Sequence, residues 1–501
     1  MLARNVLWYV TFAGFAINYM HRIHINIVLV GMVKTIRGSN SPVPVSECMR
    51  ETHYQGLVNS NYSTSQPSKP HANNEDGFEW DEQEQNQVLG SFYWLHWLTQ
   101  IPGGMLARRI GTKKVFGLAN FTGALLTFTF PHIAYLDFRL LILVRVMQGF
   151  IMGAVWPSMH HLTAHWIPPD ERSKFVSSYL GSSFGVALTY PLCGYLMDMY
   201  GWRSAFYVTG AIATVWFICW WMLVYDSPAQ HPWISETERK YIESSLDHSA
   251  NNRKMSVPWK DILTSRPLWM VGFSQIGGIW GFYTLMTQAP TYFKNILGMN
   301  IRTTGILSGL PHISRWLMSL SSAFVADYLL RNNKMSRTNV RKLATSFCTI
   351  IQGALIFGLA FTGCNSVLAV ILVIAATGAN GTVSSGPLAC IVDMSPNFAS
   401  ICLGIVGLMA NLPGFLSPLV VGYLTYQNQT ALQWQKVFFV TSGILFFFGI
   451  LYLIYGEANV QPWNNKLQEQ RSCELDQLEK LKSDENDEKS KEMSVIKNNN
   501  V

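Results

Sequence analysis

Two arginines stand inside apolar runs that are long enough to cross a bilayer, Arg22 in 6–33 and Arg145 in 139–165. A charge in a membrane-spanning helix costs at least about 2.5–3.5 kcal/mol on insertion scales, so such residues are functional by default. Neither run contains an aspartate or glutamate that could act as a partner. Because the guanidinium fork suits a carboxylate or a phosphate, this pair indicates a small anionic ligand.

Polar residues accompany both arginines at helical spacing. Asn18, Arg22 and Asn26 are four residues apart and therefore share one helix face. Gln148 lies about one turn after Arg145 on the same face. We predict that these five residues bind the anion. The alternatives are a buried carboxylate that pairs with Arg22, and an Arg145 side chain that extends to the nearby membrane surface.

Three histidines are candidates for carrying a coupling proton, because the pKa of imidazole is near neutral. His160 lies toward the inner end of its run, whereas His24 and His96 lie in or near the outer half. The alternative for each is a neutral ring that is hydrogen-bonded to a backbone or hydroxyl group. Three polar residues of the run 268–293 are equally compatible with ligand contact and with helix packing: Gln275, Tyr283 and Gln288.

The composition is that of a polytopic membrane protein. Of 501 residues, 49% are hydrophobic and only 13% are charged, whereas soluble domains have about 25% charged residues. The first apolar run is too long for a signal peptide and lacks a clear cleavage site, so we assign it to the first helix. We expect an all-α protein with about twelve membrane helices near 6–33, 87–107, 114–133, 139–165, 174–197, 204–225, 268–293, 304–329, 343–362, 366–392, 399–424 and 434–455.

Charges in the loops predict the orientation. The loops 107–114 and 330–342 are basic, whereas 34–86 is acidic. The positive-inside rule places the basic loops and both termini in the cytoplasm and the acidic loop outside. Glycosylation sequons at Asn61 and Asn428 both fall on the predicted outer side. The one cysteine pairing worth testing joins two residues of that side, Cys48 and Cys364.

The sequence lacks the signatures of an enzyme. It contains no Walker loop, no nucleophile–base motif and no His/Cys spacing typical of a metal site. We therefore expect no catalytic residue, no cofactor, no metal ion and no nucleic-acid partner. The expected partners are a small anionic substrate, Na⁺ or H⁺ as a coupling ion, and the lipid bilayer.

The second half of the chain repeats the first. WRSAFYVTG from Trp202 matches WQKVFFVTSG from Trp434, and PLCGYL from Pro191 matches PLVVGYL from Pro418. Parallel six-helix repeats are typical of major facilitator transporters, which bind substrate near the midplane between the halves. We expect an N-terminal half, 1–226, with the external loop 34–86; a cytoplasmic linker, 227–267; a C-terminal half, 268–456; and a cytoplasmic disordered tail, 457–501.

Motifs from almost the whole membrane region are specific to one transporter family. The stretches are YMHRIHIN (19–26), GSFYW (90–94), TQIPGG (99–104), RVMQG (145–149), WPSMH (156–160), WIPPDERS (166–173), QAPTYF (288–293), LPH (310–312) and DMSPNFA (393–399). With them the chain resembles the anion transporter family of sialin, the vesicular glutamate transporters and the type I sodium–phosphate cotransporters, in particular its insect phosphate-cotransporter members.

The resemblance implies a major facilitator fold and secondary transport of organic or inorganic anions. The arginines that hold the substrate's charge in this family correspond to Arg22 and Arg145, and a family histidine corresponds to His160. Four residues depart from the family pattern: Leu89 replaces a histidine, Met152 a glutamate of proton-coupled members, Gly278 an arginine, and Cys390 an asparagine. A sodium gradient, a proton gradient and the membrane potential therefore stay open as driving forces.

Charged residues of the cytoplasmic loops are predicted to act in gating. The stretch 104–114 resembles the facilitator loop between the second and third helices, and the turn 168–173 is its expected neighbour. We expect an acid of the turn to pair with a base of the loop. The gating candidates are Arg108, Arg109, Asp170, Glu171, Asp327 and Arg331.

Together these patterns predict a secondary active transporter of inorganic phosphate or organic carboxylates that works by alternating access. The plasma membrane and an endolysosomal or vesicular membrane are both compatible with the sequence. The alternative is a nutrient receptor or scaffold that keeps the fold without transporting.

Overall fold

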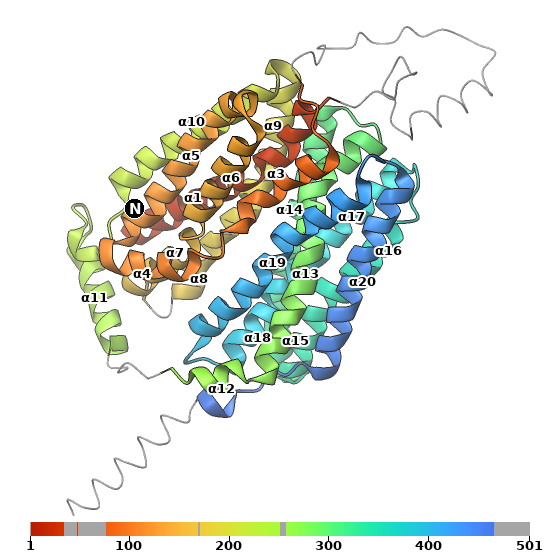
Figure 1. The fold of residues 1–501 in the computed structure, drawn as a ribbon. Helices are drawn as coiled ribbons and strands as arrows, with labels where there is room; N and C mark the ends of the chain where they lie inside the picture. Colours follow the sequence, from red (N-terminus) through yellow and green to blue (C-terminus); the bar gives the residue numbers. More distant parts are fainter. Residues whose placement is uncertain (1, 35–47, 49–76, 169–170, 251–256, 465–501) are drawn as a thin grey trace, which may run out of the picture.

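A computed structural model describes residues 2–34, 48, 77–168, 171–250 and 257–464 (Figure 1). Two helical bundles lie side by side, the N-terminal half in red to yellow-green and the C-terminal half in green to blue. Within the described ranges the extended pairing is limited to one bridge, between Val33 and Phe78. We call the end with α11 (Glu236–Ala250) and α12 (Trp259–Leu263) the linker end, and the opposite end the loop end.

In the N-terminal half every expected span is helical, and the observed ends lie within a few residues of the expected ones. Two spans are broken into two helices, and one starts with a short helix and a 3₁₀ turn. The bounds are α1 (Ala3–Met32), α3 (Glu82–Trp94) and α4 (Gln100–Ile110), α5 (Thr112–Leu136), α6 (Phe138–Met152) and α7 (Val155–Trp166), α8 (Arg172–Val176), η2 (Ser177–Leu180) and α9 (Gly181–Tyr200), and α10 (Trp202–Leu223).

The C-terminal half follows after η3 (Pro228–Gln230), α11 and α12. Its spans are interrupted by π-helical turns at η4 and η5 and by a 3₁₀ turn at η6. The bounds are α13 (Arg266–Thr291) and η4 (Tyr292–Ile296), α14 (Ile301–Arg331), α15 (Arg337–Ser346), η5 (Phe347–Ile351) and α16 (Gln352–Leu359), α17 (Ser366–Asn380), η6 (Gly381–Ser384) and α18 (Pro387–Met394), α19 (Ala399–Thr425), and α20 (Ala431–Tyr455).

Within the described residues, six helical stretches are long and apolar enough to cross a membrane by length and composition alone: Phe138–Trp166, Trp202–Leu223, Arg337–Leu359, Ser366–Met394, Ile401–Thr425 and Ala431–Tyr455. Some of the other spans bury polar residues inside the bundle. In α1, for example, Asn18, Arg22 and Asn26 are all less than 5% exposed. Polar side chains at membrane depth are tolerated where protein rather than lipid surrounds them.

Glycines set the close crossing of α3 and α6. A Cβ atom at Gly149 would lie 1.8 Å from the Phe92 carbonyl oxygen, and one at Gly153 would lie 2.2 Å from the His96 oxygen. The chain leaves the helical conformation between α3 and α4, at residues 95–99, where this crossing occurs. The approach places the Phe92 ring against the guanidinium of Arg145.

The two halves contact each other mainly through α3 against α19 and α9 against α14. A Cβ atom at Gly305 of α14 would lie 2.6 Å from the Tyr190 carbonyl oxygen of α9, so this contact also needs glycine. Three residues of α13, Phe282, Tyr283 and Met286, belong to the same buried cluster as residues of the N-terminal half. In Figure 1 the ribbons of the halves meet toward the loop end and separate toward the linker end.

A disulfide between Cys48 and Cys364 ties the loop 34–86 to the C-terminal half. The structure thus confirms the one cysteine pairing that the sequence singled out. At the other end, the start of the predicted tail is ordered: the Gln461 amide donates to the Met394 carbonyl at 2.9 Å. Residues 465–501 of that tail lie outside the described residues.

Candidate functional site

Arg22 lies in a cage of aromatic rings. It is about 15 Å from the loop end of α1, at about 1.5 Å per residue. Its guanidinium carbon is 4.8 Å from the centre of the Tyr93 ring and 5.9 Å from that of Tyr283, across the interface between the halves. The rings of Tyr19 and Phe92 complete the cage, at 5.1 and 5.2 Å. The side chain is buried, and its Nε atom has no hydrogen-bond partner.

Arg145 is fully enclosed, with 1% of its surface exposed. This burial excludes the alternative in which the side chain extends to the membrane surface. Its Nη1 donates to the carbonyl oxygen of His21 at 2.9 Å and to the Gln148 side chain at 2.7 Å, and its Nη2 donates to the carbonyl oxygen of Arg22. Arg145 therefore holds the backbone of α1 at the residue that carries the other guanidinium.

The two guanidiniums flank one ring. Their Cζ atoms lie 5.2 Å (Arg22) and 4.8 Å (Arg145) from the centre of Phe92, so they are no more than about 10 Å apart. Among the described residues neither forms an ion pair with a carboxylate. The alternative of a buried carboxylate partner for Arg22 therefore finds no support in this part of the chain.

Gln148 and Asn18 bond inside the N-terminal half. The Gln148 amide donates to the carbonyl oxygen of Gly123 and to the Thr127 hydroxyl, both at 3.2 Å. Asn18 donates to Asn120 of α5 at 3.2 Å. In this conformation both residues support the site from behind rather than lining open space.

Asn26 belongs to a set of polar contacts that join the halves. It donates to the Tyr190 hydroxyl at 3.2 Å and to the carbonyl oxygen of Met286 in α13 at 3.3 Å. The Tyr190 hydroxyl donates to the same carbonyl. Three further hydrogen bonds join the halves toward the loop end. Gln288 donates to Asn86 at 2.6 Å, Lys294 donates to the Val30 carbonyl at 2.9 Å, and the backbone amide of Gln427 donates to the Glu82 carboxylate at 2.9 Å.

A third arginine, Arg315 of α14, was missed at the sequence level. Its Nε donates to Asn380 of α17 and its Nη1 donates to Ser183 of α9, both at 3.0 Å. Asn380 in turn donates to the carbonyl oxygen of Gly278 at 2.9 Å. Arg315 stands inside the expected span 304–329, so the rule that selected Arg22 would have selected it as well.

The three candidate histidines occupy different surroundings. The Nδ1 atoms of His24 and His96 lie 2.9 and 3.0 Å from the carbonyl oxygens of Met20 and Gly149, and both rings are buried. This is the backbone-bonded arrangement that the sequence left open as the alternative. His160 is exposed, and its ring centre lies 5.3 Å from that of Tyr179.

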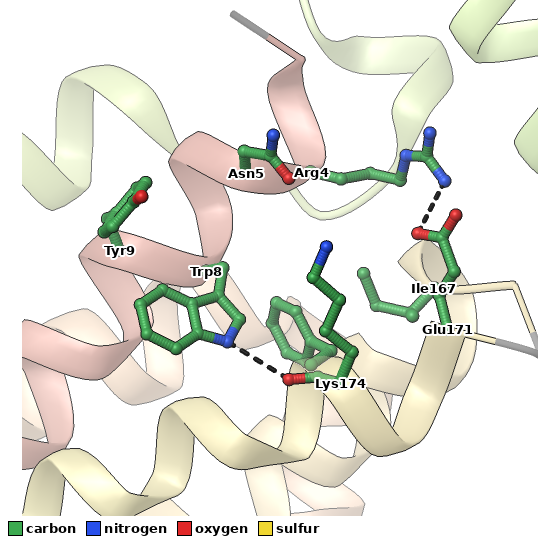
Figure 2. Close-up of a pocket in the computed structure, with 8 residues that line it drawn as sticks. Arg4, Asn5, Trp8, Tyr9, Ile167, Glu171 and Lys174 are labelled. Carbon is green, nitrogen blue, oxygen red and sulfur yellow. Dashed lines mark hydrogen bonds and ion pairs between the residues drawn. The ribbon is translucent and has the colours of Figure 1, made fainter.

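At the linker end, Glu171 binds Arg4 of α1 at 2.7 Å rather than Arg108 or Arg109. A cavity of about 260 Å³ lies beside this ion pair, between α1 and α8 (Figure 2). Glu238 of α11 accepts from the backbone amides of Ala3 and Arg4 at 3.0 and 3.2 Å. The linker helix therefore caps the start of α1.

The other gating candidates show no such contacts. The side chains of Arg108, Arg109, Asp327 and Arg331 are exposed, and none of them forms an ion pair within the described ranges. Asp170 lies outside the described residues.

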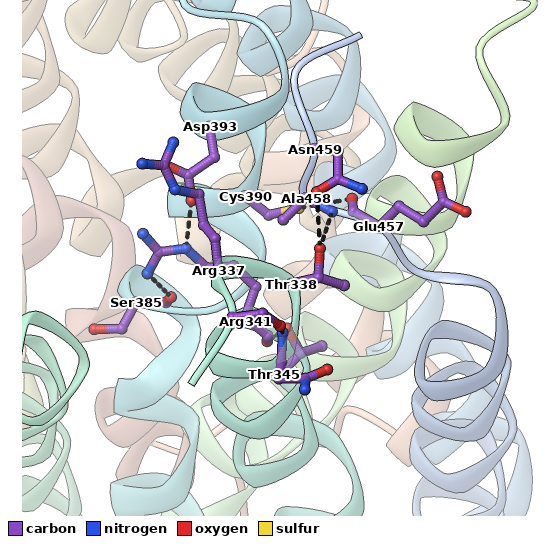
Figure 3. Close-up of polar contacts among 12 residues, drawn as sticks. Arg337, Thr338, Arg341, Thr345, Ser385, Cys390, Asp393, Glu457, Ala458 and Asn459 are labelled. Carbon is purple, nitrogen blue, oxygen red and sulfur yellow. Dashed lines mark hydrogen bonds and ion pairs between the residues drawn. The ribbon is translucent and has the colours of Figure 1, made fainter. Parts of the chain in front are cut away.

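In the C-terminal half, Asp393 contacts two arginines at the linker end (Figure 3). It accepts from Arg341 Nε at 2.7 Å and lies 3.8 Å from Arg337. Arg341 also donates to the carbonyl oxygen of Ser385 at 2.7 Å. Asp393 therefore orients helix ends.

Residues 11–418 match the model of the Major Facilitator Superfamily. The chain belongs to this superfamily. The predicted all-α major facilitator fold is thereby confirmed.

Curated relatives cover most of this facilitator. Human sialin is 35% identical over 464 residues, which cover 92% of this chain and 90% of sialin. A protein named "Putative inorganic phosphate cotransporter" from Drosophila melanogaster is 32% identical, over 92% of this chain and 86% of its own. Vesicular glutamate transporter 3 of Danio rerio is 34% identical, over 77% and 66%. The family resemblance stated from the motifs is confirmed.

Solved structures share the fold of this facilitator at low sequence identity. An inward-facing, occupied bacterial homologue of the human lysosomal transporter Spinster has a TM-score of 0.61 at 13% identity and covers 90% of this chain and 96% of its own. The xylose transporter XylE of E. coli, inward open, has a TM-score of 0.59 at 13% identity, with 88% and 95% covered.

The positions at which this facilitator departs from the family motifs are packed. Met152 and Leu89 are buried in the N-terminal half. Cys390 accepts a hydrogen bond from the Tyr452 hydroxyl at 3.3 Å.

Of the two glycosylation sequons, Asn428 lies exposed after α19 at the loop end, and Asn61 lies outside the described residues.

Proposed function

We propose that this facilitator is a secondary active transporter that carries a small anion, inorganic phosphate or an organic carboxylate, by alternating access. The observation that carries the proposal is the pair of buried guanidiniums, Arg22 and Arg145, without a carboxylate partner among the described residues. Relatives named as glutamate transporters and as a phosphate cotransporter support it.

Electrostatics gives this pair a reason to bind an anion. Two positive charges no more than about 10 Å apart repel by at least about 1.7 kcal/mol at an effective dielectric constant of about 20. An anion about 4 Å from one of them gains about 4 kcal/mol at the same dielectric constant. Without an anion the two guanidiniums repel each other, and a bound anion more than offsets this repulsion.

The two arginines have different roles in this proposal. The terminal nitrogens of Arg145 donate to carbonyl oxygens of α1 and to Gln148. We therefore assign Arg145 to positioning α1 and to adding a positive charge near the anion. Arg22 has an unbonded Nε and faces the tyrosines of both halves, so we assign it to direct contact with the anion. Asn18 and Gln148 support the two arginines, and Asn26 holds α1 against α13.

The driving force of anion transport is a sodium gradient, a proton gradient or the membrane potential. With Met152 at the family's acidic position, a proton route needs a histidine that water can reach. His160 is exposed and is our first candidate, ahead of the buried His24 and His96. We assign gating at the linker end to the ion pair of Glu171 with Arg4. The exposed loop residues Arg108, Arg109, Asp327 and Arg331 would form ion pairs in the other conformation of the alternating-access cycle.

We place the linker end in the cytoplasm and the loop end outside, or in the lumen of an endolysosomal or vesicular membrane. The basic loops support this orientation, and so does the disulfide of Cys48 and Cys364, because disulfides persist in oxidising compartments. Asn61 and Asn428 are then available for glycosylation.

Uptake into proteoliposomes tests the proposal. Radiolabelled phosphate, urate, sialate and glutamate are offered with and without a sodium gradient, a pH gradient and an imposed potential. We expect saturable uptake of at least one anion, its loss in Arg22→Ala, and its retention in Arg139→Ala, which removes an exposed arginine at the start of α6. Absence of uptake for all four under every gradient contradicts the proposal and favours a receptor or scaffold.

A further inference from the structure

Arg315 places a positive charge in the middle of the C-terminal half. It lies about 21 Å along α14 from the loop end, at about 1.5 Å per residue. Within the described residues it pairs with no carboxylate. A charge at this depth is costly and calls for a functional reason.

The contacts of Arg315 are incomplete for a guanidinium. Its acceptors are two neutral groups, the Asn380 amide oxygen and the Ser183 hydroxyl. Its Nη2 forms no hydrogen bond in the described part of the chain, and the side chain is only half-buried. Charged acceptors bind a guanidinium about twice as strongly as neutral ones, so an anion would displace the serine.

Arg315 and Arg22 share their surroundings although they belong to different halves. The rings of Phe282 and Tyr283, which are neighbours in α13, have their centres 5.6 Å apart. Arg315 stacks on Phe282 at 4.3 Å, and Arg22 lies over the next residue of α13, Tyr283, at 5.9 Å. The two guanidiniums therefore face adjoining rings of α13, and their Cζ atoms lie no more than about 16 Å apart.

We propose that Arg315 is the ligand that the C-terminal half contributes to the anion, so that one oxyanion bridges Arg22 and Arg315. This inference rests on the proposed function. A carboxylate or phosphate presents several acceptor oxygens and can accept from two forks at once. Its arrival breaks the bond of Arg315 to Ser183, which joins α14 to α9, and so changes a contact between the halves.

Three variants test this ligand: Arg315→Gln, Arg315→Lys and Ser183→Ala. The probe is inorganic phosphate, with glutamate and sialate as parallel arms, and the readouts are the KM of uptake and the thermal stabilisation of the purified protein by each anion. We expect KM to rise about 10- to 100-fold in Arg315→Gln, the range for one charged hydrogen bond. Arg315→Lys recovers part of the loss. Ser183→Ala leaves KM within about twofold of the unmodified protein, since it removes only the neutral acceptor.

The outcomes separate the ligand role from a structural one. An unchanged KM in Arg315→Gln, or an equal rise in Ser183→Ala, makes Arg315 a tether between the halves and overturns the inference. If Arg22→Ala loses uptake while Arg315→Gln keeps it, the inference falls and the proposed function stands. If the unmodified protein neither takes up nor is stabilised by any of the three anions, and takes up no urate either, both fall. Stability without anion shows whether each variant is folded.

Discussion

Replacing Gly149 by alanine tests the packing that places the Phe92 ring beside the guanidiniums of both Arg22 and Arg145. The added Cβ would lie 1.8 Å from the carbonyl oxygen and 2.7 Å from the carbonyl carbon of Phe92. These are backbone atoms, so no side-chain rotation relieves the overlap. α3 and α6 must separate by about 1.6 Å to restore an ordinary contact of 3.4 Å. The Phe92 ring moves with the backbone of α3.

Two consequences follow from that shift. Overpacking of a close-packed core costs about 1–3 kcal/mol, occasionally more. A displacement of about 1 Å at a binding site can cost on the order of 100-fold in rate. We therefore expect Gly149→Ala to lower both the melting temperature and the anion uptake.

The matched control is Gly443→Ala in α20, where nothing lies within 4 Å of the new Cβ. Alanine is favoured over glycine within a helix by up to about 1 kcal/mol, so this variant should be neutral or slightly stabilised. Melting is followed with a thiol-reactive dye, since Cys193, Cys348, Cys390 and Cys402 are buried until the protein unfolds. If Gly149→Ala melts and transports like the unmodified protein, the close crossing of α3 and α6 is not needed for the site.

Three further changes probe the parts around the site. Glu238→Gln removes the charge that caps α1, and we expect a loss of about 0.5–2 kcal/mol in stability. Glu236→Gln on the same helix should lose no more than about 0.5 kcal/mol, because it breaks only an exposed ion pair with Lys240. Cys48→Ser should leave Cys364 reactive toward a membrane-impermeant maleimide, with transport retained; labelling only after permeabilisation would contradict the orientation. Asn428→Gln should increase electrophoretic mobility in a glycosylating host, and unchanged mobility of this variant and of enzymatically deglycosylated protein would show that this residue is not modified.

The sequence predicts the helices of this protein well because membrane spans are long and uniform in composition. The expected run 6–33 is α1, residues 3–32, and the expected run 399–424 is α19, residues 399–425. Arg22 could also be selected from sequence, because a charge inside an apolar run is conspicuous. Its buried state and its lack of an acidic partner among the described residues agree with that selection.

The partners of the charged residues could not be predicted in the same way. Arg145 bonds to backbone oxygens of α1, and a sequence pattern carries no signal for a carbonyl of a distant helix. Glu171 binds Arg4 rather than the expected loop arginines because α1 begins next to the turn that follows α7. Arg315 carries the same signal as Arg22, a charge inside an apolar run, but the family motifs do not include it.

The most direct test of the central claim is the concentration dependence of anion uptake by Arg22→Gln, measured in proteoliposomes beside Arg139→Gln. Glutamine keeps hydrogen-bonding capacity but removes the charge. We predict that kcat/KM for the transported anion falls at least about tenfold in Arg22→Gln, the cost of one charged contact, and is unchanged in Arg139→Gln. Equal uptake by both variants would contradict the assignment of Arg22 as the anion ligand.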